Sequence, residues 1–225
     1  MNNQRTYYRR NLPHYQPPYA TCHIVFRLDG SLPRHMIEVL RNGREKEKEM
    51  IASIKDEKRK RDEWRAHHQA YFEKFDALMD GNTAGPRWLA DDRVAEIVAE
   101  AIHFRDAREY DLLVHTIMPN HVHMVCTVGR SGTPSPEEEN RAVGRNAIPT
   151  YRILQSLKRH TARKANTLLS RLGPFWQEES YDHVIRDSEE LERTIWYVFF
   201  NPVKAGLVET WDQWKWTYVK PRLVS

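Results

Sequence analysis

The pattern of apolar and polar positions predicts four short strands in this chain. Apolar runs of strand length, rich in β-branched residues, occupy positions 19–28, 110–117 and 121–128. A shorter run follows at 181–185. The tripeptide Met-Pro-Asn at 118–120 joins the second and third runs into a hairpin, although its proline disfavours a tight primed turn. These four segments are the expected sheet.

Helical periodicity predicts the elements between the strands. Residues 33 to about 78 are expected to be helical, as are 88 to about 108 and about 151 to 172. The second of these helices has one continuous apolar face, made of Val94, Ile97, Val98, Ala101 and Ile102. In the first, positive and negative charges alternate, which is typical of a solvated helix pair or of one extended helix.

A further helix is expected at 188–200. Ser188 is its N-cap candidate, and acidic residues fill the first turn. Pro202 is expected to end this helix near Asn201, because the residue before a proline is pushed out of the α region.

The order of these elements fits a ferredoxin-like α+β sandwich with an antiparallel sheet. Residues 19–225 are then a single domain, interrupted by a charged helical insertion at 34–86 for which the sequence suggests no role. Residues 1–18, rich in Arg, Tyr and Pro, are expected to be a flexible arm. Residues 129–149, rich in Gly, Ser, Pro and Glu, are expected to be a loop.

Composition narrows the class of protein. With 225 residues, 40% apolar residues and seven tryptophans, the chain can bury a substantial core. It has no apolar run long enough to span a bilayer, and its polar N-terminus is no signal peptide, so a cytoplasmic location with access to the nucleoid is expected. The two cysteines, Cys22 and Cys126, lie in separate strand-like segments and are expected to be buried thiols.

Positive charge is concentrated in one predicted helix. The net charge is only +4, but residues 147–177 contain no Asp or Glu. Arg152, Arg159 and Arg163 share a helical face, which fits contact with a phosphate backbone, although an ordinary solvated helix would look the same. The candidate DNA-binding residues are Arg152, Lys158, Arg159, Arg163 and Lys164, with Arg186 further along the chain.

Two imidazoles stand one residue apart in the third predicted strand. Side chains at i and i+2 of a strand point to the same face, so His121 and His123 project together while Val122 and Met124 face the core. Two histidines on a rigid strand form a partial metal site. Taken alone the spacing is weak evidence, since most such pairs are surface or hydrogen-bonded histidines.

The last predicted helix places a phenol one turn before an amide. Tyr197 and Asn201 are four residues apart and share a helical face. A buried core tyrosine and a C-cap asparagine would produce the same pattern.

Taken together, these motifs resemble the single-tyrosine HUH transposases and, within them, the REP-associated tyrosine transposases. The family's histidine motif and its helical tyrosine with an amide one turn later are matched by His121, His123, Tyr197 and Asn201. Three further family motifs occur in the family's order, at 175–177 (Phe-Trp-Gln), 182–186 (Asp-His-Val-Ile-Arg) and 201–208 (Asn-Pro-Val-Lys-Ala-Gly-Leu-Val). The resemblance covers residues 20–28 and 88–217, and five ordered motifs are far more specific than any one.

The resemblance implies a metal-dependent endonuclease and strand transferase acting on single-stranded, hairpin-forming DNA repeats. Tyr197 would be the nucleophile and would form a 5′-phosphotyrosine. His121, His123 and Asn201 would hold Mg²⁺ or Mn²⁺. Family members occur as monomers and as dimers that share active sites, so a homodimer stays open. No membrane partner is expected.

Weaker expectations concern three neighbouring residues. Trp176 is a candidate for stacking on a base, although a core position is the better explanation, and Asp182 and His183 either support the site or brace the fold. Two other classes of function stay open. One is a catalytically silent DNA- or RNA-binding protein, which would not need the four site residues. The other is a relaxase or replication initiator, which is usually a longer chain.

Overall fold

A computed structural model describes residues 7–9, 13–15, 19–82, 84–129 and 149–223. The chain divides into two compact units, one formed by Met1–Asp29 and Trp88–Ser225 and the other by Gly30–Arg87. Of the expected arm at 1–18, only the short antiparallel strands β1 (Tyr7–Arg9) and β2 (Pro13–Tyr15) are described. The rest of that arm, and nearly all of the expected loop at 129–149, lie outside the described residues.

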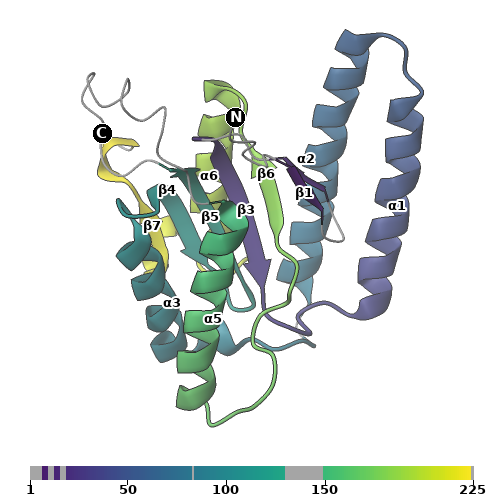
Figure 1. Cartoon of the computed structure of the whole chain (residues 1–225). Coiled ribbons are helices and arrows are strands. Elements are labelled where there is room, and N and C mark those ends of the chain that lie inside the picture. The colour runs from purple at the N-terminus through teal and green to yellow at the C-terminus, as the bar shows by residue number, and fades with distance from the viewer. Residues whose placement is uncertain (1–6, 10–12, 16–18, 83, 130–148, 224–225) are drawn as a thin grey trace, which may run out of the picture. The chain divides into compact units, whose positions relative to one another are not determined.

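A five-stranded antiparallel sheet forms the first unit, which confirms the α+β class (Figure 1). Its order is β6-β3-β5-β4-β7, so the four predicted strands follow the ferredoxin-like order 4-1-3-2, and β7 extends the sheet beyond β4. The strands are β3 (Thr21–Arg27), β4 (Tyr110–Ile117), β5 (His121–Val128), β6 (Tyr181–Val184) and β7 (Thr217–Val219).

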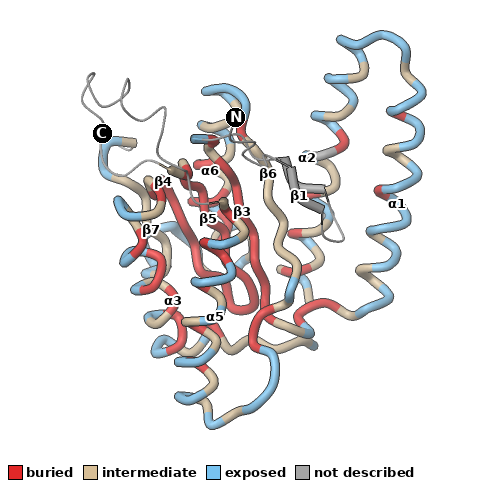
Figure 2. The backbone as a smooth tube through the Cα atoms, in the orientation of Figure 1, coloured by how far each residue is buried: buried red, intermediate tan, exposed pale blue. Residues whose placement is uncertain are grey.

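Helices cover both faces of this sheet. On one face α3 (Asp92–Arg105) and α5 (Thr150–Leu168) pack over the larger core, and the central strands beneath them are buried (Figure 2). On the other face α6 (Ser188–Lys204) packs over β4 and β5. Short 3₁₀ turns complete the unit: η1 (Trp88–Ala90), η3 (Trp211–Gln213) and η4 (Pro221–Leu223).

The alternation along β5 sends its side chains to two different cores. Val122 and Met124 belong to the larger core, under α3 and α5. Val125 belongs to a smaller core with Ile195 and Val198 of α6. Because the strand has a period of two, His121 and His123 share the α6 face of the sheet with Val125. This confirms the predicted orientation of the histidine pair.

The two cysteines are free and buried, as expected. Cys22 of β3 lies opposite Cys126 of β5 in the antiparallel register. Burial raises the pKa of both thiols, that of Cys22 to about 12, so both are protonated at neutral pH.

Helix α6 begins at Ser188, as predicted, but the predicted N-cap is wrong by one residue. Asp187, not Ser188, is the N-cap, and its side chain accepts a hydrogen bond from the backbone N–H of Glu190 at 2.8 Å. Asp and Ser are about equally good caps, so residue type alone does not separate them.

The predicted end of α6 is wrong. The helix continues through Pro202 to Lys204 instead of ending at Asn201. Pro202 lies in the last turn, where its missing N–H removes a single intrahelical hydrogen bond. Asn201 and Pro202 are both buried, and the backbone N–H of Ala205 still donates to the Asn201 carbonyl at 2.8 Å. Packing and the closing hydrogen bond therefore outweigh the local preference of the residue before proline.

The second unit is a pair of helices, α1 (Arg34–Ala52) and α2 (Glu57–Gly81). Asp56 begins α2 by accepting a hydrogen bond from the backbone N–H of Arg59 at 2.6 Å. The guanidinium of Arg44 on α1 lies 4.7 Å from the ring centroid of Tyr71 on α2. Of the two helical arrangements that the charge pattern allows, the structure has the pair. None of the helices described is long and apolar enough to cross a membrane.

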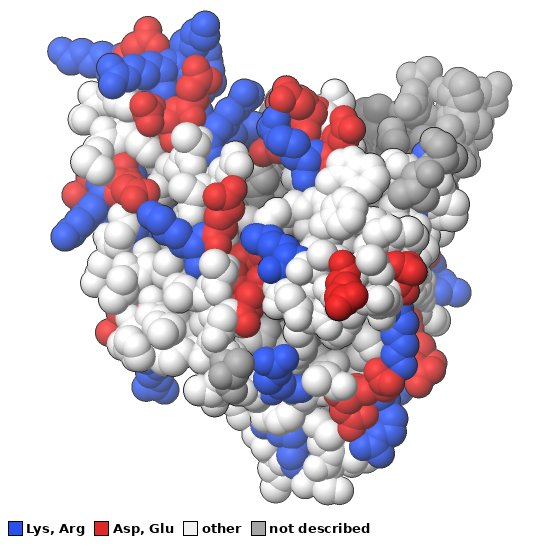
Figure 3. All heavy atoms as spheres, turned by 180° about the vertical axis from the view of Figure 1, so that it is seen from behind, with Lys and Arg blue, Asp and Glu red and all other residues white. Residues whose placement is uncertain are grey.

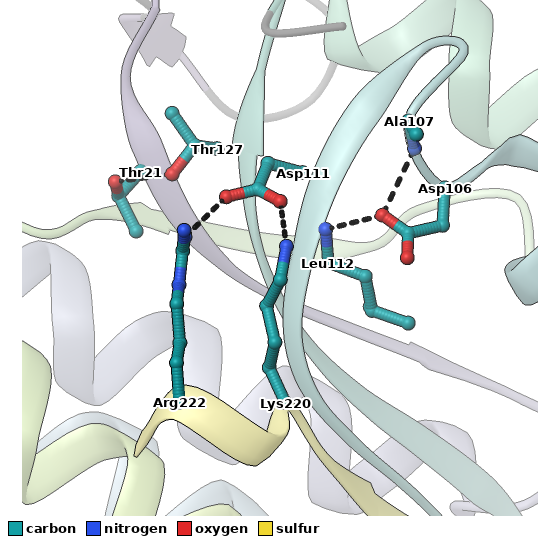
Figure 4. A network of polar contacts seen from close by, with 8 residues as sticks. All are labelled: Thr21, Asp106, Ala107, Asp111, Leu112, Thr127, Lys220 and Arg222. Atoms are coloured by element: carbon teal, nitrogen blue, oxygen red, sulfur yellow. Dashed lines mark hydrogen bonds and ion pairs between the residues drawn. The ribbon is translucent and has the colours of Figure 1, made fainter. Parts of the chain in front are cut away.

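Asp111 on β4 anchors the C-terminal segment to the sheet (Figure 4). Its carboxylate accepts hydrogen bonds from Lys220 and, at 2.8 Å, from Arg222. The Asp111 side chain is only 14% exposed, so solvent screens these contacts less than those of an exposed ion pair.

We expect Asp111→Asn to lower the free energy of unfolding by about 1 to 2 kcal/mol, because it weakens two charge-assisted hydrogen bonds. Urea denaturation followed by circular dichroism measures the change. Glu189→Gln is the matched control, since its ion pair with Arg193 is exposed and should contribute less than about 0.5 kcal/mol. Equal losses for the two variants would contradict the assigned role of Asp111.

Candidate active site

The two histidines of β5 converge through their Nε2 atoms. His121 and His123 are fully buried, and their Nε2 atoms lie 2.8 Å apart. Their ring centroids are 4.7 Å apart, with the ring planes at 77°. The pair is therefore a compact cluster of imidazole nitrogens and not two separate surface histidines.

The Nδ1 atom of each ring forms a hydrogen bond to a neighbouring side chain. In His121 this nitrogen bonds the amide oxygen of Asn120 at 2.6 Å. In His123 it lies 3.2 Å from Nε2 of His23, which belongs to the neighbouring strand β3. In protein metal sites generally, partners of this kind fix the orientation of a histidine ring, and the other ring nitrogen is the ligand atom.

The donor set fits a divalent ion. Two ligand nitrogens at right angles, each about 2.1 Å from a metal, lie about 3 Å apart, which is close to the observed Nε2 separation. The short Nε2–Nε2 contact has room for one proton, and a cation would take the place of that proton. Asn201 offers a neutral amide oxygen, a ligand type suited to Mg²⁺ and Mn²⁺.

Helix α6 presents the phenol to the histidine pair. The ring centroids of Tyr197 and His123 are 6.1 Å apart, in an edge-to-face arrangement. Asn201 follows one turn later on the same helical face and is fully buried. Two pairs of residues that are far apart in the chain, one on a strand and one on a helix, thus meet on the same face of the sheet.

Lys204, which the sequence reasoning overlooked, contacts the phenol. Its Nζ donates a hydrogen bond to the hydroxyl of Tyr197 at 3.1 Å. The sequence does indicate this contact, because Tyr197 and Lys204 are seven residues apart and would share a face of one helix. This indication was masked by the expectation that the helix ends before Pro202. Asn120 and His23, the partners of the histidine pair, were also not proposed as site residues.

The strand β6 contributes His183 to this same face, opposite His23 in the register. Its Nε2 bonds Glu190 of α6 at 2.7 Å. Burial opposes ionisation of Glu190, but the hydrogen bonds from His183 and from the backbone N–H of Arg186 outweigh it and lower the pKa of Glu190. His183 therefore ties α6 to the sheet, which is the bracing role that was one of its two expected roles.

Other predicted residues line a pocket of about 370 Å³ between α5 and the segment that leads into β6. Lys158 donates to the backbone carbonyls of Gln177 and Glu178, at 2.9 and 3.1 Å. Trp176 is 7% exposed, and its Nε1 donates to Thr161 at 2.8 Å. The pocket residues that the sequence analysis had proposed as site residues are Lys158, Arg159, Trp176 and Asp182.

The basic residues of α5 lie across the sheet from the histidine pair. Arg152, Arg159, Arg163 and Lys164 are exposed, while the buried side of α5 packs on the larger core. Arg186 is exposed at the start of α6. On the face of the molecule seen in Figure 3, basic and acidic side chains are interspersed and form no field of a single sign.

The fold and the site define a ferredoxin-like α+β protein in which a strand-borne histidine pair faces a helical tyrosine. No protein-family model matches the chain. A curated protein of Haemophilus influenzae, named as a REP-associated tyrosine transposase, is 25% identical over 108 residues. This alignment covers 48% of the present chain and 58% of that relative's length. The match confirms that the chain resembles the REP-associated tyrosine transposases.

A solved structure of a REP-associated tyrosine transposase bound to a REP hairpin is also similar. The TM-score is 0.46 at 14% sequence identity, and the alignment covers 93% of this chain and 80% of that one.

Proposed function

We propose that this protein is a metal-dependent endonuclease and strand transferase that acts on single-stranded DNA at hairpin-forming repeats. The observation that carries the proposal is the phenol of Tyr197 on α6, whose ring lies 6.1 Å from the ring of His123, with Asn201 one turn away. A binding protein would need neither the phenol nor the histidine pair. The name of the Haemophilus influenzae relative supports a transposase associated with REP repeats.

Tyr197 is the nucleophile in this proposal. Its oxygen attacks the scissile phosphorus, forms a phosphotyrosine at the 5′ end and releases a 3′-hydroxyl. The bond energy kept in the ester allows a second 3′-hydroxyl to attack and rejoin the strand without ATP. Helix α6 supplies the positioning, because its packing on the sheet fixes the phenol relative to the histidines.

His121, His123 and Asn201 would hold a divalent ion, for which we propose Mg²⁺ or Mn²⁺. When bound, such an ion polarises the scissile phosphate and offsets charge in the transition state. Asn120 and His23 act as positioning residues, since they fix the two imidazole rings through Nδ1.

Covalent capture tests the proposal directly. The protein is incubated with Mn²⁺ and a library of DNA hairpins with randomised single-stranded flanks, and adducts that survive denaturation are isolated and sequenced. An adduct confined to hairpin substrates is the expected result. Binding without an adduct would favour the catalytically silent alternative, and adducts on strands without a hairpin would favour the relaxase or initiator alternative.

The exposed basic side chains of α5 are proposed to contact the phosphate backbone. Loss of Arg159 and Arg163 together should weaken hairpin binding and reduce the slope of log K against log salt by about 0.7 to 0.9 for each contact. Fluorescence anisotropy over a salt series measures both quantities. Arg93→Ala with Arg108→Ala is the matched control, because it also removes two exposed cations but from outside α5. Unchanged affinity and slope in the α5 variant would refute this contact surface.

A further inference from the structure

Lys204 is the last residue of α6, and its side chain folds back along the helix onto Tyr197. Its Nζ lies 3.1 Å from the phenol oxygen and 4.5 Å from the centroid of the tyrosine ring. The ammonium thus contacts the one atom of Tyr197 that would form a bond to phosphorus.

The continuation of α6 through Pro202 brings this contact about. Residues seven apart in a helix lie on the same face, two turns from each other. Helical side chains also lean toward the N-terminus, which directs the long chain of Lys204 back toward Tyr197. If the helix ended at Asn201, as the proline suggests locally, residue 204 would leave this face.

The chemistry at the phenol oxygen requires a group of this kind. Free tyrosine is almost wholly protonated at neutral pH, so attack on phosphorus demands that negative charge be stabilised on its oxygen. Hydrogen-bond donors aimed at an atom where charge develops lower the barrier of such a step. Among the described contacts of Tyr197, the bond from Lys204 is charge-assisted and directed at this atom.

We infer that Lys204 is a catalytic residue that stabilises the negative charge on the Tyr197 oxygen, both when this oxygen attacks the strand and when it later departs. The inference rests on the function proposed above. In cleavage, the phenol proton passes to water, the bond from the tyrosine oxygen to phosphorus forms, and the bond from phosphorus to the 3′ oxygen breaks. The departing 3′ oxygen takes a proton from water.

Rejoining reverses these steps, and Tyr197 becomes the leaving group. The bond from phosphorus to the tyrosine oxygen breaks, and negative charge returns to the same atom within reach of the same ammonium. One residue therefore serves both halves of the transfer without itself gaining or losing a proton. This predicts that a loss of Lys204 slows cleavage and rejoining by similar factors.

The plainer explanation is that Lys204 only stabilises the helix, since a cation near a helix C-terminus interacts favourably with the last carbonyls. That role would affect unfolding and leave the rate of the chemical step unchanged. Lys204→Met keeps most of the side chain and removes the charge, Lys204→Arg keeps the charge, and Lys204→Ala opens space for a small amine.

The experiment measures single-turnover cleavage and rejoining of a captured hairpin substrate in Mn²⁺, with hairpin affinity and thermal unfolding measured beside it. Lys204→Met should slow both rates about 100-fold, on the scale of losing one oxyanion donor, while hairpin affinity stays within about twofold. Lys204→Arg should retain rates within about tenfold of the wild type. Ethylammonium, but not ethanol at the same concentration, should restore part of the Lys204→Ala rate.

Arg193→Met is the control, because it removes an exposed cation from the same helix that contacts Glu189 and not the phenol. Its rates should match the wild type. A folded Lys204→Met variant that cleaves within about threefold of the wild type would overturn the inference and leave the proposed function intact. So would a Lys204→Ala variant on which ethylammonium has no effect. If the wild type itself forms no adduct on any hairpin, the proposed function fails and the inference falls with it.

Discussion

Tyr197→Phe is expected to abolish covalent capture of DNA and strand cleavage, with little change in folding or hairpin affinity. The substitution removes one oxygen and keeps the ring, so the edge-to-face contact with His123 is preserved. Tyr197 is half-buried, and its hydroxyl accepts a hydrogen bond from Lys204 at the end of the helix, so little stability is expected to depend on this hydroxyl. The loss should therefore fall almost wholly on the chemical step, where no other atom can form the ester.

Tyr181 is the control for this assignment. It lies on β6, opposite Val25 of β3, and so belongs to the same face of the sheet as the histidine pair. Unlike Tyr197, it has no amide ligand one helical turn away. Tyr181→Phe should therefore still form the adduct. A labelled oligonucleotide that mass spectrometry maps to Tyr181, or to any tyrosine other than Tyr197, would overturn the assignment.

The strands and the orientation of the histidine pair could be predicted from the sequence, because a strand's period of two leaves few choices. The limits of β4 and β5 coincide with the predicted 110–117 and 121–128. Val122 and Met124 lie in the core as expected, which fixes His121 and His123 on the other face.

The C-terminal end of α6 could not be predicted in this way. Local rules place an end before Pro202, but burial of Asn201 and Pro202 in the tertiary structure overrides them. The contact between Lys204 and Tyr197 depends on that outcome, so it was hidden for the same reason. The local preferences of a few residues do not account for the tertiary packing that decides where this helix ends.

The apolar periodicity of a helix likewise could not predict on which face of the sheet that helix packs. An amphipathic pattern shows that α5 buries one side, but not against which side of the sheet. The structure places α5 on the face opposite the histidine pair. If the basic residues of α5 and the site both contact DNA, as proposed above, they would do so at different parts of the DNA molecule. The structure places α1 and α2 in a compact unit of their own, Gly30–Arg87. That residues 34–86 are an insertion within a single domain remains a prediction.

Replacing His121 or His123 with Ala is expected to abolish cleavage by removing one of the proposed metal ligands. Each substitution leaves one imidazole of a pair whose Nε2 atoms lie 2.8 Å apart, and a single imidazole with one amide holds Mn²⁺ poorly. Manganese affinity, measured by electron paramagnetic resonance of free Mn²⁺, should fall more than about 100-fold. Hairpin binding should largely persist, because the proposed phosphate contacts lie on α5.

Substituting a positioning residue should lower manganese affinity less than substituting His121 or His123. Asn120→Ala leaves both imidazoles in place but frees the ring of His121, so manganese affinity should fall only about 10- to 100-fold. His103→Ala, an exposed histidine on α3, should leave metal affinity and cleavage unchanged. Undiminished cleavage by the His121 or His123 variant, or by the wild type in excess chelator, would refute the metal assignment. Hairpin binding, measured beside metal affinity, separates a metal centre from a merely structural histidine pair. Unfolding would lower DNA binding together with metal affinity, whereas loss of a ligand lowers metal affinity and cleavage and leaves DNA binding largely intact.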